Sequence, residues 1–177
     1  LAMKGDILRG IVELVTNSDD AYGSERDGGE INIHLDFDNP EGLIVKVHDL
    51  AKGLLWDDLE KNMMQLGEKA SGHAEGNEVR GLFGRGAKDV AIFGKVTFET
   101  IRRGKFSALE IDGTSWDALP LEKNATATTE NRLALNIPEG KSGFCATITC
   151  SKSKYQHFLN KRQSNFVTKI RDHVQLR

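Results

Sequence analysis

A chain of 177 residues is long enough for one domain with a buried core. Its formal net charge of -2 and its mixed 28% of charged residues exclude the broad basic surface that binds nucleic acid by charge alone. No apolar stretch approaches the length of a membrane span and the opening residues lack the apolar core of a secretory signal, so we expect a cytoplasmic protein without membrane contact.

The first expected element is an amphipathic helix from about Ile7, which carries Glu13, Asn17 and Asp20. Spacings of four and three place these polar side chains on one helical face, while the apolar positions seat the helix on a core. In the pair formed by Glu13 and Asn17, the acid can take a proton from water, and the amide oxygen can bind a hard cation such as Mg²⁺. A surface helix with a solvated polar edge explains the same pattern, and for this helix alone it is the commoner explanation.

Two alternating segments, 30–37 and 43–49, predict a hairpin packed on the first helix. Asp49 ends the second strand and precedes a loop that leads into a helix over about 56–66. A carboxylate at a strand end can accept a hydrogen bond from an exocyclic amine such as that of adenine. An aspartate that caps a helix or a turn is the alternative.

Residues 67–80 lose apolar periodicity and gain glycine, which predicts a mobile loop. They lead into residues 81–93, where glycines spaced G-x-x-G-x-G open another expected helix and offer bare backbone amides to phosphate oxygens. This is no Walker loop, because Asp89 rather than Ser or Thr follows Lys88. The spacing also differs from the G-x-G-x-x-G of dinucleotide-binding folds.

The second half of the chain predicts more sheet. Its polar and weakly patterned part, residues 113–130, is interpreted as an insertion between strands. Cys145 and Cys150 lie five apart in an expected strand and should face opposite sides, so we expect no disulfide. The other expected elements are a hairpin, two strands and a closing helix: 95–102 with 105–112, 133–137, 143–151 and 155–174.

The order of these motifs resembles the GHKL ATPases, the family that groups gyrase B, Hsp90, histidine kinases and MutL. The resemblance covers about residues 7–151 and rests on Glu-x-x-x-Asn-x-x-Asp-Ala, a strand ending in Asp with Gly four residues later, the mobile loop and G-x-x-G-x-G. It implies an α/β two-layer sandwich with a mixed, mostly antiparallel sheet covered on one face by helices. Residues 1–177 would form one ATP-binding domain, a piece of a longer protein, with residues 67–80 as the ATP lid.

The resemblance also implies roles for single residues. Glu13 is the implied general base for water, Asn17 the Mg²⁺ ligand and Asp49 the acid that binds adenine, with Thr147 supporting the adenine site through water. The remaining implied contacts to ATP are Asp20, Ala21, Gly53, Leu54, Lys69, Gly81, Gly84, Arg85, Gly86, Ala87 and Lys88.

Two positions refine the resemblance. Ala51 replaces the first glycine of the usual D-x-G-x-G, which would change how closely the loop meets the base. Asp20 stands where histidine kinases tend to carry a basic residue, which favours the MORC, MutL and Hsp90 side of the family. We therefore expect a Mg²⁺-dependent ATPase, slow on its own, that couples ATP or ADP binding to conformational change or homodimerisation of a larger protein acting on DNA or protein. A regulatory module without turnover and a protein histidine kinase domain are the alternatives.

Overall fold

The computed structural model of the chain describes residues 7–25, 28–64, 90–151 and 167–172. A short 3-10 turn, η1, follows the first helix, and a second one, η2, precedes the third strand. The elements in chain order are α1 (Ile7–Tyr22), η1 (Gly23–Glu25), β1 (Ile31–Asp36), β2 (Gly42–Asp49), α2 (Trp56–Met64), η2 (Val90–Phe93), β3 (Gly94–Arg102), β4 (Lys105–Asp112), β5 (Ala118–Thr126), α4 (Thr129–Leu135) and β6 (Gly143–Ser151).

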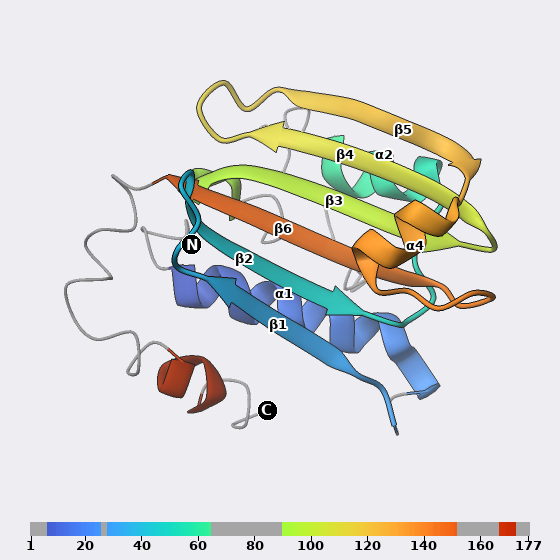
Figure 1. Cartoon of the computed structure of the whole chain (residues 1–177), viewed down its shortest axis with the longest axis horizontal. Coiled ribbons are helices and arrows are strands. Elements are labelled where there is room, and N and C mark those ends of the chain that lie inside the picture. Colours follow the sequence, from blue (N-terminus) through green and yellow to red (C-terminus); the bar gives the residue numbers. More distant parts are fainter. Residues whose placement is uncertain (1–6, 26–27, 65–89, 152–166, 173–177) are drawn as a thin grey trace, which may run out of the picture.

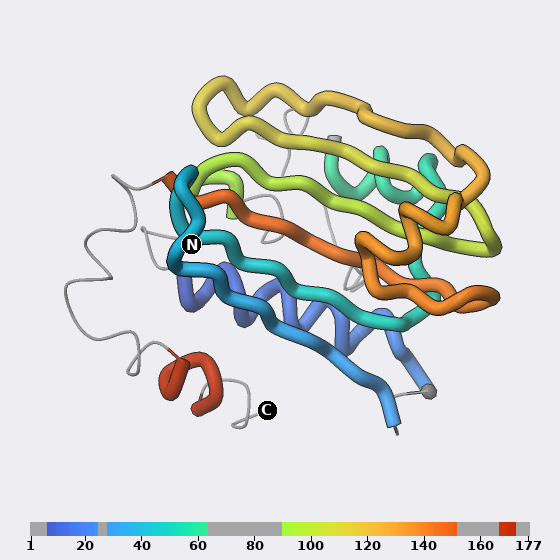
Figure 2. Tube along the Cα trace, in the orientation of Figure 1, coloured from blue at the N-terminus to red at the C-terminus, as the bar shows by residue number. Residues whose placement is uncertain are grey.

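The described strands form one six-stranded sheet in the order β1-β2-β6-β3-β4-β5. Every pair among them is antiparallel. Figure 2 shows the late strand β6, in orange, lying between β2 and β3, so the last strand joins the two halves of the sheet. Helix α1 packs under β1 and β2, and α2 packs under β4 and β5 (Figure 1). The expected two-layer α/β sandwich is confirmed.

The main core lies between the sheet and helices α1 and α2. Ile7, Ile11 and Leu14 recur at spacings of four and three, so one stripe of α1 faces the sheet and is buried. Phe98 on β3 is fully buried and stacks on Phe144 of β6, with ring centroids 6.0 Å apart. Truncating such a buried ring to alanine costs about 3–5 kcal/mol.

Helix α4 lies on the other face of the sheet, where residues 133–137 were predicted to form a strand (Figure 1). That prediction is wrong because local capping outweighs the short apolar run. Thr128 Oγ1 accepts from Asn131 N at 3.2 Å, and Asn131 Oδ1 accepts from Thr128 N at 3.0 Å, which makes a reciprocal cap. Asn136 ends the helix with a φ of 51°.

Strand β5 lies within residues 113–130, so the interpretation of that segment as an insertion is corrected. It is an edge strand paired with β4, and two irregularities interrupt its register. These irregularities and the exposure of an edge strand explain why the sequence shows no clear alternation. Of the predicted closing helix over 155–174, residues 167–172 are helical and the others lie outside the described residues. None of the helices in the described part of the chain is long and apolar enough to cross a membrane.

Candidate functional site

The polar face of α1 is only partly exposed to solvent. Glu13 and Asp20 are half-buried, while Asn17 is only 4% exposed and Ala21 is buried. Asn17 Nδ2 has no hydrogen-bond partner among the described residues. A buried donor left unpaired costs about 1–3 kcal/mol. A solvated edge therefore does not describe Asn17, whose position suits a group that binds a ligand.

Asp49 is fully buried at the end of β2, where it pairs with Phe144 of β6. Its Oδ1 accepts a hydrogen bond from Ala51 N at 3.0 Å, whereas no hydrogen bond of good geometry reaches Oδ2 within the described residues. Burial raises the pKa of Asp49 to about 6, and interactions with the Ser18 hydroxyl and with the backbone of Ala51 and Phe144 partly offset this rise. Within the described residues, Oδ2 is therefore a buried acceptor that no donor meets in good hydrogen-bond geometry.

Helix α1 and strand β2 meet at this carboxylate. Ser18, which comes directly after Asn17, is buried and lies close enough to Asp49 to lower its pKa. At the end of α1, Tyr22 Oη accepts from Leu50 N at 3.0 Å and donates to Glu30 O at 2.6 Å. The fold therefore brings the two early motifs together, and it ties the backbone after Asp49 to α1. No sequence motif indicated a role for Ser18 or Tyr22.

The loop from Leu50 to Leu55 crosses the ends of β6 and β3. Gly53 has a φ of +61°, and a Cβ added there would lie 2.4 Å from Ile101 O, so this position requires glycine. Leu54 N donates to Thr100 Oγ1 at 2.8 Å, and the same hydroxyl donates to Gly143 O at 3.1 Å. Gly53 and Leu54 thus lie buried beside the strand ends.

Ala51, which replaces the usual glycine, fits the loop without strain. It is buried, and its φ is not among the positive values of the chain. Its amide donates to Asp49, so the residue helps to orient the carboxylate.

The structure separates Thr147 from Asp49. Because Phe144 pairs with Asp49 and side chains alternate along β6, Thr147 points to the opposite face of the sheet. Its neighbours there include Cys145, whose Sγ lies 3.8 Å from Thr147 Oγ1. The threonine on the face of Asp49 is Thr100, which pairs with Phe144. The sequence carries a signal for it, since Thr100 occupies the same strand phase as buried apolar residues of β3.

The predicted lid and phosphate loop lie outside the described residues. This holds for Lys69, Gly81, Gly84, Arg85, Gly86, Ala87 and Lys88. The described chain resumes in η2, where Val90, Ala91 and Phe93 are buried and the turn contacts α1 and β6. The turn just after the glycine cluster is therefore packed beside the helix that carries Asn17.

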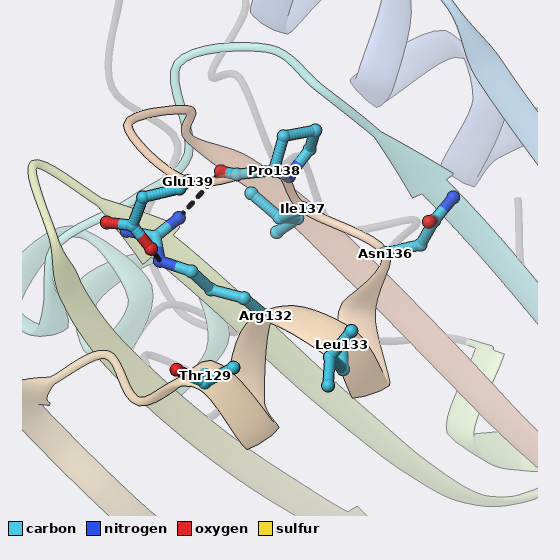
Figure 3. Close-up of a pocket in the computed structure, with 7 residues that line it drawn as sticks. All are labelled: Thr129, Arg132, Leu133, Asn136, Ile137, Pro138 and Glu139. Atoms are coloured by element: carbon cyan, nitrogen blue, oxygen red, sulfur yellow. Dashed lines mark hydrogen bonds and ion pairs between the residues drawn. The ribbon is translucent and has the colours of Figure 1, made fainter.

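A separate pocket of about 220 Å³ lies at α4 (Figure 3). It contains none of the predicted site residues, and α4 belongs to the cluster on the far face of the sheet. Arg132 Nη1 donates to Pro138 O at 2.9 Å and to Lys141 O at 3.1 Å, and Arg132 Nε lies 3.0 Å from Glu139 Oε2. The guanidinium holds the turn after α4, so its role is structural. The lining residues are Thr129, Arg132, Leu133, Asn136, Ile137, Pro138 and Glu139.

The fold is thus a two-layer α/β sandwich in which the buried carboxylate of Asp49 lies beside Ser18 of α1, the helix that carries Glu13 and Asn17. The family described as histidine kinase-, DNA gyrase B- and HSP90-like ATPase matches residues 7–138, and the chain belongs to that family. No curated protein sequence matches the chain significantly. This match confirms the family resemblance drawn from the motifs, and it identifies the chain as an ATP-binding ATPase-type domain of that family.

Proposed function

We propose that the domain binds ATP with Mg²⁺ and hydrolyses it, and that nucleotide state drives conformational change or homodimerisation of a larger protein. The observation that supports this most is the pair of unpaired buried polar atoms, Asn17 Nδ2 and Asp49 Oδ2. Folding leaves both without partners inside the described part of the domain, at a cost that a polar ligand would remove. One is a donor and the other an acceptor. Ser18, the residue after Asn17, interacts with the carboxylate of Asp49.

Asp49 is proposed to recognise the adenine base. Its Oδ2 would accept a hydrogen bond from the exocyclic amine, while Oδ1 stays held by Ala51 N. Guanine presents a carbonyl oxygen at the equivalent position, which would face the carboxylate oxygen with no proton between them. A buried site of this kind rejects the wrong base strongly because its polar atom stays unpaired. Gly53 and Leu54 would line the pocket.

Asn17 is proposed to bind Mg²⁺, and Glu13 is proposed to activate the attacking water. An amide oxygen from Asn17 is a hard ligand of the kind Mg²⁺ accepts. Among the described residues no group of three or more His, Cys, Asp or Glu side chains could hold a metal ion, so most ligands would be phosphate oxygens and water. Mg²⁺ would neutralise charge on the phosphates. Glu13, one turn before Asn17, would take the proton from the attacking water, with Asp20 and Ala21 completing this side of the site.

The phosphate contacts are proposed from the sequence. The backbone of Gly81, Gly84, Gly86 and Ala87 would bind phosphate oxygens. Lys69, Arg85 and Lys88 would add positive charge to the same end of the nucleotide. Thr147 is left out of the proposal because its side chain points to the other face of the sheet.

Calorimetry of ADP and GDP binding tests the adenine assignment. We expect wild type to bind ADP at least about 100-fold more tightly than GDP, and Asp49→Asn to lose most of that preference. Asp38→Asn is the matched control, because Asp38 is an exposed carboxylate after β1. Equal binding of the two nucleotides by wild type would contradict the proposal.

Hydrolysis is preferred over a regulatory module without turnover because Glu13 is half-buried on the face of α1 that carries Asn17. Asp20 on the same face favours the gyrase, MutL and Hsp90 pattern over a histidine kinase. Steady-state release of phosphate from ATP, measured with and without Mg²⁺, separates these functions. Transfer of phosphate to a protein histidine without release would identify the kinase alternative.

A further inference from the structure

Strand β5 contains a bulge at Lys123 and Asn124 that turns both residues toward α2. Phe106 pairs with Ala125 and Ala108 pairs with Glu122, so two residues of β5 stand opposite one residue of β4, Ser107. Asn124 takes a φ of 50°, a conformation that asparagine tolerates better than most residues. Bulges commonly re-aim side chains beside functional sites.

Both bulge residues contact Trp56, the first residue of α2. Asn124 Oδ1 accepts from Trp56 N at 2.9 Å, and Lys123 Nζ lies 4.7 Å from the centroid of the Trp56 ring. Ser107 fixes Asn124 in turn: Asn124 N donates to Ser107 Oγ at 3.0 Å, and Ser107 Oγ lies 3.2 Å from Asn124 Oδ1. The carboxamide oxygen therefore accepts from both Trp56 N and the Ser107 hydroxyl, which fixes its orientation.

Helix α2 needs this contact because it has no capping side chain of its own. Leu55 precedes the helix and its carbonyl accepts the first helical bond from Leu59 N at 3.0 Å, but a leucine side chain offers no acceptor. Trp56 is only 5% exposed, so water would replace Asn124 poorly at its amide. The cap comes instead from a strand 68 residues further along the chain.

We infer that Asn124 is a positioning residue for the purine end of the nucleotide site. Two hydrogen bonds restrain the loop after Asp49: Thr100 Oγ1 accepts from Leu54 N, and Asn124 Oδ1 accepts from Trp56 N. Both restrain the end of the segment that contains Gly53 and Leu54. Removing the second hydrogen bond leaves a buried donor unpaired and lets the end of the loop move. A loop that must be ordered on binding lowers affinity by the fraction of time it spends in the wrong place. This inference rests on the proposed function.

Three variants test the inference. Asn124→Gly removes the acceptor while keeping a residue suited to positive φ. Asn124→Asp keeps the acceptor and adds a charge that is favourable at a helix N-terminus. Thr128→Ala is the matched control, because it also removes a helix N-cap but does so for α4 on the other face of the sheet.

Two measurements are made on each variant after circular dichroism has shown that it is folded. In nucleotide-free protein, amide hydrogen exchange over residues 51–57 should be at least about tenfold faster in Asn124→Gly than in wild type, and unchanged in the other two. The Kd for ADP should rise about tenfold in Asn124→Gly and stay within about twofold of wild type in Asn124→Asp and Thr128→Ala.

The outcomes separate the two proposals. If wild type itself fails to bind ADP, the proposed function fails, and the role of Asn124 at a purine site fails with it. If wild type binds ADP and Asn124→Gly binds it equally well, Asn124 is no positioning residue although the site stands. An equal loss of affinity in Thr128→Ala would show that general stability rather than loop position is responsible, which overturns the inference.

Discussion

Leu54 N donates to Thr100 Oγ1 across 2.8 Å, which joins the loop after Asp49 to a fully buried hydroxyl in the middle of the sheet. Thr100 stands in the same row as Asp49, because Asp49 pairs with Phe144 and Phe144 pairs with Thr100. The carboxylate and the loop that would enclose a base are therefore fixed to the same row of residues.

Thr100→Val should destabilise the protein by about 1–3 kcal/mol, because the variant keeps the shape of the side chain but leaves Leu54 N buried without an acceptor. Thr100→Ser should recover most of that loss. Thr97→Val is the control, since Thr97 is half-buried and pairs with Thr147 on the other face. Urea unfolding measures all three, and a neutral Thr100→Val would contradict a structural role for the hydroxyl.

Gly53→Ala should destabilise more than Gly140→Ala. Both glycines have positive φ, +61° and +74°, so both variants carry the conformational cost of about 1–2 kcal/mol. Only at Gly53 would the new Cβ also meet backbone, 2.4 Å from Ile101 O, whereas Gly140 has open space. The difference in unfolding free energy between the two variants measures the close approach of loop and sheet. Equal losses would show that the loop moves aside freely.

The sequence was sufficient for most of the fold because its elements carry strong local patterns. The 4 and 3 spacing in α1 and the alternation in β2 and β3 predict buried faces that the structure confirms. Thr147 was assigned from the family resemblance alone. The register of β6 against β2, which decides which face of β6 meets Asp49, puts its side chain on the opposite face.

Other features depend on contacts far apart in the chain. Residues 133–137 carry an apolar run too short to distinguish strand from helix, and the reciprocal cap at Thr128 decides for helix α4. Asn124 is a polar residue in a polar segment, and only the pairing of β4 with β5 brings it to Trp56. No local pattern could have indicated that a strand supplies the cap of α2.

The charge of Asp49 should make stability depend on pH in an unusual direction. Its pKa is raised from 3.8 to about 6 by burial, so the folded state takes up a proton over a range in which the unfolded state is already ionised. The stabilising effect of that proton is fully present below about pH 4 and is lost as the pH rises to about 6. For this single group, a shift of this size corresponds to about 3 kcal/mol.

Asp49→Asn tests this directly, because the variant cannot ionise. We expect the unfolding free energy of Asp49→Asn minus that of wild type to increase by about 2 kcal/mol between pH 4.5 and pH 7.5. Comparing the two proteins at each pH cancels the other titrating groups. A difference that stayed constant with pH would show that Asp49 ionises normally in the folded protein.

Substitutions on the polar face of α1 should separate nucleotide binding from hydrolysis. Glu13→Gln keeps the size and hydrogen-bonding atoms of the side chain but cannot take a proton from water, so it should bind ATP normally and lose about a hundredfold or more in turnover. Asn17→Ala should instead lose the part of nucleotide affinity that depends on Mg²⁺, because no other described residue on this face offers an amide oxygen. Calorimetry with and without Mg²⁺ and steady-state phosphate release measure the two effects.

Asp19→Asn is the control for both variants, since Asp19 is exposed on α1 and lies outside the face formed by Glu13 and Asn17. It should change neither affinity nor turnover by more than about twofold, in line with a surface substitution. If Glu13→Gln hydrolysed ATP at the wild-type rate, Glu13 would not be the general base. If Asn17→Ala still bound nucleotide with full Mg²⁺ dependence, the metal would be held by residues other than Asn17.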